Sequence, residues 1–231
     1  MRALLLAAGY GTRLRPLTNT IPKCLVPIKG RPLLEIWLNT LTQAGLGPFL
    51  VNTHYLADQV KEFIAASAYQ DKVALSHEPM LLGTAGTLMA NLSFFNGEDG
   101  LLIHADNYCL ANFPAFVEAH RRRPSQCLLT MMTFRTETPS TCGIVELDAE
   151  GIVIGFHEKV ASPPSNLANG AIYLLSAQFM TLLKAKLPTV KDFSTDVLPN
   201  FVGQIYTYEN TDFFIDIGMP DAYAKANAYA G

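Results

Sequence analysis

The chain has 231 residues, of which 49% are hydrophobic, so it can form one large α/β domain or two small domains with a substantial core. Seventeen lysine and arginine residues oppose 20 aspartate and glutamate residues, and this balance excludes nucleic acid as a favoured partner. The four cysteines are widely spaced and form no C-x-x-C pair. They favour reduced thiols in a cytoplasmic protein over a disulfide framework or a zinc site.

Membrane insertion is equally disfavoured. No apolar run approaches the roughly 18 residues of a spanning helix. Residues 3–8 follow Arg2 and are similar to the hydrophobic region of a signal peptide, but this run is shorter than such a region usually is. A buried first strand explains the run better.

The first half of the chain alternates predicted strands and helices. We expect a strand at residues 2–8, a glycine-rich loop to residue 22, a helix at 32–44, a strand at 48–53, a helix at 56–66, a strand at 72–77, a helix from 84 and a strand at 101–105. This order is typical of a parallel sheet with helices on both faces.

In the second half several predicted strands adjoin without helices. We expect a helix at 113–122, strands at 128–134, 143–147, 153–158 and 168–174, a helix capped by Ser176, strands at 204–208 and 213–216, and a helix at 220–229. The whole predicts a Rossmann-like three-layer α/β/α sandwich, mostly parallel, with an antiparallel or mixed extension. We expect a single domain over residues 1–231 with a functional division near residue 110.

Ligands of such sheets bind beyond the carboxyl ends of the strands. There the first strand enters GYGTRLRPLT at residues 9–18, followed by Pro22 and Lys23. Glycines permit positive φ and let backbone amides turn toward an anion. The loop matches neither the dinucleotide fingerprint, which needs a small residue where Leu14 stands, nor the P-loop. It is either a phosphate cradle or a surface loop with solvated basic residues.

These residues resemble the sugar-1-phosphate nucleotidyltransferase family, whose signature is G-x-G-T-R-L-x-P-L-T followed downstream by Pro-Lys. The resemblance implies a fold of the nucleotide-diphospho-sugar transferase type, with a nucleotide-binding half at residues 1–110 and a sugar-phosphate-binding half at 111–231. It also implies that the loop wraps a nucleoside triphosphate and that Lys23 lies near the sugar phosphate as well. The nucleotide site would include Leu6, Ala8, Gly9, Gly11, Thr12, Arg13 and Lys23.

A second segment, LGTAGTL at residues 82–88, opens the helix predicted from residue 84. Its small residues allow a flat base to approach, and the amides at the helix N-terminus would add donors. The alternative is a tight strand-to-helix turn. The resemblance implies that Gly83, Thr84 and Gly86 help to recognise the base. The segment is similar to the guanylyltransferase branch, although uridylyl and adenylyl relatives carry variants, so GTP and UTP both stay open.

Two acidic residues are candidate metal ligands. Asp106 follows the strand predicted at 101–105, where a hard cation would need an oxygen ligand. Asp216, in FFIDIGMP, follows a strand and precedes a helix, so it is either a ligand or a helix cap. The family has its second metal-binding aspartate in a similar segment, and the resemblance implies Mg²⁺ between Asp106 and Asp216. Asp212 is outside this pattern.

Strand alternation alone predicts that Glu158 and Lys159 form an exposed ion pair on a sheet edge. The resemblance implies instead that they bind the hydroxyls and phosphate of the sugar, with contributions from Asp106, Gly143 and Asn169. The sequence departs from the family at Ala105, Val160 and Asn169-Gly170-Ala171, and the left-handed β-helix that many relatives append is absent from it. A core-only enzyme is expected.

The remaining candidates have ordinary interpretations. His54 and His77 have no partners at metal spacing and are expected to be loop or strand-end residues. Residues 120–123, His-Arg-Arg-Arg, predict a solvated cationic end of a helix. Phe94 and Phe95 are expected to be exposed and would allow a homodimer.

The resemblance implies the reaction NTP + sugar 1-phosphate → NDP-sugar + pyrophosphate, with Arg13, Lys23, Asp106 and Asp216 as the catalytic residues. GTP with mannose 1-phosphate is the first expectation and UTP with an amino-sugar 1-phosphate the second, in nucleotide-sugar biosynthesis for cell-envelope polysaccharide. A silent nucleotide-sugar-binding module is one alternative. Another is a glycosyltransferase, although Tyr108 stands where its Asp-x-Asp motif needs the second aspartate.

Overall fold

The computed structural model describes residues 1–229 and divides into two compact units. Unit 1 comprises residues 1–81, 103–110 and those from 213 onward, and unit 2 comprises residues 82–102 and 111–212. The chain therefore enters each unit more than once. The nucleotide-binding and sugar-phosphate-binding halves expected on either side of residue 110 are defined by ligands, and they stay a prediction.

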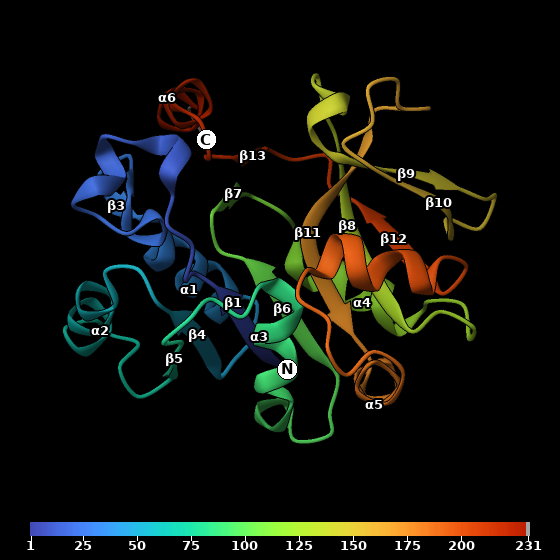
Figure 1. Ribbon diagram of the computed structural model, residues 1–231, viewed down its shortest axis with the longest axis horizontal. Helices are drawn as coiled ribbons and strands as arrows, with labels where there is room; N and C mark the ends of the chain where they lie inside the picture. The colour runs from blue at the N-terminus through green and yellow to red at the C-terminus, as the bar shows by residue number, and fades with distance from the viewer. Residues whose placement is uncertain (230–231) are drawn as a thin grey trace. The chain divides into compact units, whose positions relative to one another are not determined.

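Unit 1 is built on parallel strands. β1 (Arg2–Leu6), β4 (Phe49–Thr53) and β5 (Val73–His77) pair in parallel in that order, and β6 (Gly100–His104), which begins in unit 2 and ends in unit 1, lies next to β1 (Figure 1). Every residue of β4 is buried, as expected of a strand covered on both faces. The intervening helices are α1 (Leu33–Gln43) and α2 (Ala57–Ala65). The predicted βαβ order is confirmed.

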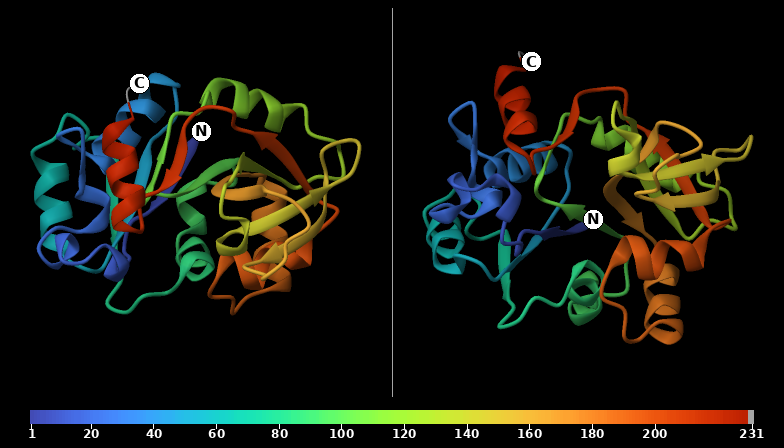
Figure 2. Two further views of the ribbon diagram at one scale, coloured as in Figure 1. Left: turned by 90° about the horizontal axis from the view of Figure 1, so that it is seen from above. Right: turned by 45° about the horizontal axis from the view of Figure 1, so that its top comes forward.

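Shorter elements complete unit 1. They are the hairpin β2 (Pro27–Ile28) and β3 (Arg31–Pro32), the ribbon β7 (Asn107–Cys109) and β13 (Phe214–Asp216), three 3₁₀ helices (Thr12–Leu14, Leu17–Asn19 and Lys23–Leu25) and α6 (Pro220–Ala228). Helix α6 lies beside the hairpin (Figure 2). The Tyr223 hydroxyl donates to the Pro27 carbonyl at 2.8 Å, and the Asn227 side chain accepts from the Lys29 amide at 2.9 Å.

Unit 2 holds the antiparallel extension. Strand β11 (Leu167–Leu175) pairs antiparallel with β8 (Leu129–Arg135) and β9 (Gly143–Leu147), β9 pairs antiparallel with β10 (Val153–Glu158), and β12 (Ile205–Glu209) runs parallel to β8. The helices are α3 (Thr84–Ala90), α4 (Phe113–Arg121) and α5 (Ala177–Lys186), with a π-helical turn at Phe193–Val197 and 3₁₀ turns at Leu92–Phe95, Pro139–Thr141 and Leu198–Phe201. Ser176 caps α5 by accepting from the Phe179 amide at 3.0 Å, as predicted.

The expectation that residues 120–123 are solvated is wrong for His120, which is only 1% exposed. His120 follows Phe113 and Phe116 at the i, i+3, i+7 spacing of the buried face of α4. Its Nδ1 lies 2.8 Å from Thr130 Oγ1, and its Nε2 lies 3.4 Å from Asp99 Oδ2. Helix periodicity therefore prevails over the basic composition of the segment at this position.

The expectation of an exposed diphenylalanine is also wrong. Phe95 is fully buried and Phe94 is half-buried. The two rings lie edge to face, with centroids 5.5 Å apart. The phenylalanine pair that was expected to allow a homodimer is therefore part of the packing of unit 2.

Within residues 1–229, no helix has both the length and the apolar character needed to cross a membrane.

The His120 contacts predict an acid-sensitive fold. Burial lowers the pKa of His120 below its usual 6.5, and the contact with the His120 ring lowers the pKa of Asp99 below 3.8. Both groups bind protons more readily in the unfolded chain, so the free energy of unfolding falls as the pH decreases. Urea titrations between pH 7 and pH 5 measure the free energy of unfolding as a function of pH. We expect His120→Gln to reduce the slope of this dependence and the exposed His77→Gln to leave the slope unchanged. Equal slopes in His120→Gln and wild type would contradict the assignment.

Candidate active site

The glycine-rich loop contains one glycine that its backbone requires. Gly11 has φ +63°, and a Cβ atom there would lie 3.0 Å from Thr18 Cγ2 and 3.2 Å from Lys23 Cβ. The Thr18 hydroxyl donates to the Gly11 carbonyl at 2.7 Å and fixes the turn. Gly9 is exposed, and no heavy atom lies within 4 Å of the Cβ it lacks. The argument for positive φ therefore holds at Gly11 in this loop.

The two candidate metal ligands come together through the β7–β13 ribbon. Asp216 pairs with Asn107, the residue that follows Asp106. Trp37, from α1, donates its indole N–H to the Asn107 carbonyl at 2.9 Å and anchors the ribbon. Residues that are 110 positions apart along the chain, Asp106 and Asp216, thus lie on adjacent backbones.

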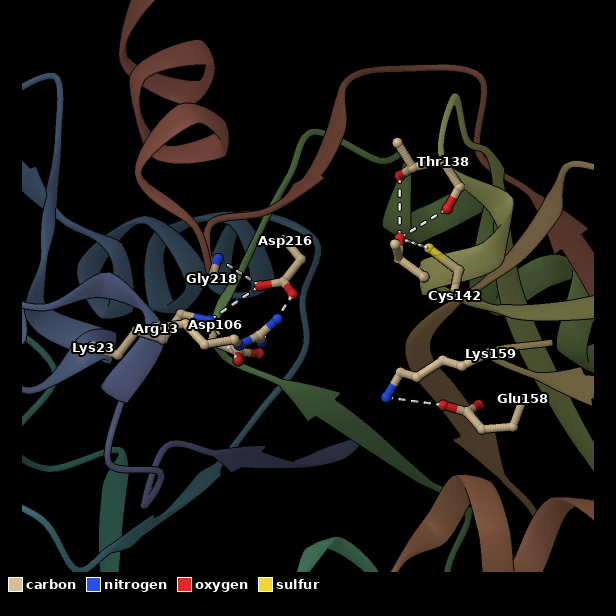
Figure 3. A network of polar contacts seen from close by, with 10 residues as sticks. Arg13, Lys23, Asp106, Thr138, Cys142, Glu158, Lys159, Asp216 and Gly218 are labelled. Carbon is tan, nitrogen blue, oxygen red and sulfur yellow. Dashed lines mark hydrogen bonds and ion pairs between the residues drawn. The ribbon is translucent and has the colours of Figure 1, made fainter. Parts of the chain in front are cut away.

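Lys23 lies between these two carboxylates (Figure 3). Its Nζ is 2.8 Å from Asp106 Oδ2 and 3.0 Å from Asp216 Oδ1. The lysine side chain is only 9% exposed, whereas those of Asp106 and Asp216 are 39% and 47% exposed. Arg13 approaches from the loop, with Nη2 at 3.5 Å from Asp216 Oδ2. The structure therefore brings the four predicted catalytic residues together within unit 1.

The pKa shifts follow from this arrangement. Burial alone would lower the pKa of Lys23, but the charges and hydrogen bonds of Asp106 and Asp216 raise it above 10.5. Burial acts to raise the pKa of Asp106, but the Lys23 ammonium outweighs it, so the pKa lies below 3.8. Lysine and aspartate are both charged at neutral pH, and each stabilises the other.

Gly218 allows the close packing around Asp216. The Asp216 carboxylate accepts from the Gly218 amide at 2.8 Å, and a Cβ atom on Gly218 would lie 2.7 Å from Arg13 Nη2. Helix α6 begins after Met219 and has no side-chain cap. The alternative interpretation of Asp216 as a helix cap is therefore wrong.

The carboxylates of Asp106 and Asp216 have the chemistry of a site for a hard cation. One oxygen of each lies within 3.0 Å of the same nitrogen, so the two converge on one position. Among the described residues there is no group of three or more His, Cys, Asp or Glu side chains that could hold a metal alone. Magnesium is commonly held by one or two carboxylates together with substrate phosphates, and this pair fits that pattern.

The residues predicted to bind the sugar phosphate lie in unit 2. Glu158 pairs with Gly143 across β9 and β10, and a Cβ atom on Gly143 would lie 2.6 Å from Glu158 Oε2. Lys159 Nζ is 3.1 Å from Glu158 Oε1, and the lysine is 66% exposed (Figure 3). The ion pair that alternation alone predicts is thus present. A role of these residues in sugar binding stays a prediction.

Asn169, on β11, uses its side-chain amide locally. Its Nδ2 donates to the Tyr173 hydroxyl at 2.7 Å, and its Oδ1 accepts from the Ala171 amide at 2.9 Å. Ala171 has φ +53°, a left-handed conformation that favours glycine. The shift in β-sheet register between Asn169 and Tyr173 accommodates the turn.

The start of α3 differs from its expected form. Ala85 and Gly86 donate their amides to the Lys191 carbonyl at 2.9 and 3.3 Å, so the expectation that this helix end offers donors to a base is wrong for both. Gly83 has φ +81°, and a Cβ atom there would clash with the carbonyl oxygen of Lys191. The Thr84 hydroxyl accepts from the Phe193 amide at 2.7 Å. The tight-turn interpretation fits these contacts, and base recognition stays a prediction.

Sequence reasoning assigned no role to two buried polar residues at the carboxyl edge of the unit 1 sheet. Asn52, on β4, is 4% exposed, and Glu78, directly after β5, is 2% exposed. Asn52 Nδ2 donates to Glu78 Oε1 at 2.9 Å. An asparagine within the apolar run FLVNT was the available signal, because a buried polar side chain needs a partner.

A sequence profile of the nucleotidyl transferase family matches residues 2–230. The chain belongs to this family. It is 33% identical over 225 residues to the mannose-1-phosphate guanylyltransferase catalytic subunit beta of Drosophila pseudoobscura pseudoobscura and 31% identical over 225 residues to that of Danio rerio. These alignments cover 95% of this chain but 59% and 62% of the two relatives. The chain thus spans about three fifths of the length of these relatives.

A solved structure matches this nucleotidyl transferase over nearly its whole length. HddC from Yersinia pseudotuberculosis, complexed with GMP-PN, has a TM-score of 0.81 and 26% sequence identity. The match covers 98% of this chain and 97% of that chain. The α/β fold predicted from the sequence, of the type found in nucleotide-sugar transferases, is confirmed.

Removing the ammonium should destabilise unit 1. In Lys23→Met the carboxylates of Asp106 and Asp216 lose the cation that both contact. We expect a loss of about 1–2 kcal/mol in the free energy of unfolding, less than for a fully buried pair because both carboxylates reach solvent. Urea unfolding at pH 7 measures it. The exposed Lys61→Met on α2 is the matched control and should stay within about 0.5 kcal/mol of wild type. Equal losses in both variants would contradict the role of Lys23.

Proposed function

We propose that this nucleotidyl transferase condenses a nucleoside triphosphate with a sugar 1-phosphate to give a nucleotide sugar and pyrophosphate. The observation that carries the proposal is the convergence of Arg13, Lys23, Asp106 and Asp216 beside the glycine-rich loop. The preferred substrates are GTP and mannose 1-phosphate. The names of the relatives and the GMP-PN complex of HddC support this choice.

In this reaction the protein needs only to position the substrates and to offset their charge. The phosphate oxygen of a sugar 1-phosphate is already an anionic nucleophile, so no general base is needed. The protein must hold two anions in line and offset the charge that builds on the α-phosphate and on pyrophosphate. Arg13 steadies the departing pyrophosphate. Lys23, whose ammonium stays protonated well above neutral pH, offsets the repulsion between the reacting phosphates.

Asp106 and Asp216 would hold the divalent cation, which we propose to be Mg²⁺. When bound, the cation neutralises phosphate charge. The two aspartates set its position through the β7–β13 ribbon, and Lys23 prevents their mutual repulsion in the absence of ligand.

The remaining predicted roles belong to the same proposal. Glu158, Lys159, Gly143 and Asn169, with Asp106, are proposed to bind the sugar phosphate. The nucleotide is proposed to contact the loop after β1 and the start of α3, at Leu6, Ala8, Gly9, Gly11, Thr12, Gly83, Thr84 and Gly86. In this scheme the nucleotide-binding half is residues 1–110 and the sugar-phosphate half is residues 111–231. We place the reaction in the cytoplasm, in nucleotide-sugar biosynthesis for cell-envelope polysaccharide.

Two alternatives have less support. A silent nucleotide-sugar-binding module would have lost loop cations or acidic ligands, whereas this chain keeps them all. A glycosyltransferase would need a second aspartate at position 108. Tyr108 is instead buried there, with its ring centroid 5.7 Å from that of Phe213.

UTP with an amino-sugar 1-phosphate is the second substrate pair to test.

A grid of four nucleoside triphosphates against several sugar 1-phosphates, read by pyrophosphate release, tests the function. We expect the highest rate with GTP and mannose 1-phosphate. Asp106→Ala and Asp216→Ala should each lower turnover about a hundredfold or more, since each removes a ligand of the proposed cation that offsets the phosphate charge. The control is Asp212→Asn, an exposed carboxylate four residues before Asp216. Tight nucleotide-sugar binding without pyrophosphate release would favour the silent module.

Chelation tests the requirement for a cation. EDTA should abolish pyrophosphate release by the wild-type protein, and Mg²⁺ added in excess should restore it. The thermal midpoint should barely change on chelation, because Lys23 holds Asp106 and Asp216 together without a metal. Full activity in EDTA would contradict the assignment of these carboxylates.

A further inference from the structure

A chain of hydrogen bonds connects the carboxyl ends of β1, β4 and β5. After β1, the Ala7 amide donates to Asn52 Oδ1 at 2.6 Å, and Asn52 Nδ2 donates to Glu78 Oε1 at 2.9 Å. The Glu78 carbonyl lies 2.7 Å from His54 Nδ1, and His54 Nε2 lies 3.0 Å from the Tyr10 hydroxyl. Tyr10 and Ala7 belong to the same loop, so the bonds close a circuit.

The hydrogen-bond partners of His54 determine the tautomer of its neutral ring. A carbonyl oxygen can only accept, so Nδ1, which faces the Glu78 carbonyl, carries the proton. In the neutral ring Nε2 is then the acceptor, and the Tyr10 hydroxyl donates to it. Both ring nitrogens are engaged. The expectation that His54 is an ordinary loop histidine is therefore incomplete.

The middle of the loop has few other anchors. Gly9 is exposed and offers no side chain, and Tyr10 is 45% exposed, so burial does not hold it. The Tyr10 ring is in contact with two others, His54 with centroids at 5.4 Å and Tyr55 at 5.6 Å. Gly11 is held separately by Thr18. The bond to His54 is thus the polar tether of the Tyr10 side chain.

We propose that His54, acting through Tyr10, is a positioning residue that fixes the loop at residues 7–11 for binding of the nucleoside triphosphate. The assignment of the ligand rests on the proposed function. Arg13 and Lys23 are held by Asp106 and Asp216 instead. Loss of the tether should therefore weaken nucleotide binding and leave the chemical step nearly unchanged, because a preorganised loop lowers the entropy lost on binding.

Two variants isolate the tether. Tyr10→Phe removes only the hydroxyl and keeps the ring, whereas His54→Ala removes the ring that orients it. The control is Tyr206→Phe on β12, a tyrosine outside the circuit. Amide hydrogen exchange of the ligand-free proteins is followed in a peptide that begins at or before Leu5 and extends past Leu14, so that it retains the hydrogen-bonded amides of Ala7 and Leu14. We expect exchange about three- to tenfold faster in both variants, the range of one hydrogen bond, and unchanged in the control.

Kinetics give the second readout. KM for the triphosphate should rise about three- to tenfold in Tyr10→Phe with kcat within about twofold of wild type. The double variant Tyr10→Phe/His54→Ala should be no worse than His54→Ala alone, because both act on one contact. A fall in kcat at unchanged KM would overturn the positioning role.

The hydrogen-exchange measurement separates this inference from the proposed function. Unchanged exchange at residues 7–14 in both variants would overturn the tether whatever the catalytic result. Faster exchange, in a protein whose wild type releases no pyrophosphate with any substrate pair, would confirm the tether and refute the proposed function. Because Tyr10→Phe keeps the ring contacts at a half-exposed site, its thermal midpoint should match wild type and exclude a general loss of folding.

Discussion

The site in unit 1 depends on one buried lysine held between two carboxylates. Lys23 is the least exposed of the charged groups there, and its ammonium contacts both Asp106 and Asp216. Without it, two like charges on adjacent backbones would repel each other. With it, the two carboxylates are held close together around one positive charge, which is the arrangement that a divalent cation or a phosphate-bearing ligand would meet. The same residue therefore contributes to folding and to the proposed chemistry.

Several backbone features serve this arrangement. The β7–β13 ribbon sets the two aspartates side by side, and the Trp37 indole fixes the ribbon to α1. Gly218 has no side chain where Arg13 approaches, and Gly11 turns where Thr18 and Lys23 pack. Gly11 is required by its positive φ, and Gly218 leaves room for the Arg13 guanidinium, so both glycines lie next to the charged cluster.

The elements with long apolar patterns could be predicted from sequence, because burial on both faces leaves a strong signal, as in β4. β7 and β13 have only three residues each, too few for periodicity, and β7 was missed although Asp106 beside it was identified. Composition misled at His120, where the helix period decides burial. At the start of α3, the Ala85 amide donates to the carbonyl of Lys191. A partner so distant in the sequence cannot be predicted from a local pattern. The charged residues of the site were found through resemblance to a family motif, whereas the contacts that orient them are nonlocal.

The polar circuit and the charged cluster divide the work of unit 1 between hydrogen bonds and ion pairs. Asn52, Glu78 and His54 connect strand ends through hydrogen bonds whose geometry is directional, so they fix the backbone from which the loop departs. Arg13, Lys23 and the two aspartates interact mainly through charge, which tolerates small displacements when a ligand enters. The proposed function, in which the site would accept highly charged substrates and release a charged product, calls for both properties. In the proposed function, the hydrogen-bonded loop would keep its amides in place while the ionic side chains exchange an internal partner for a phosphate, and the two sets share no side chain.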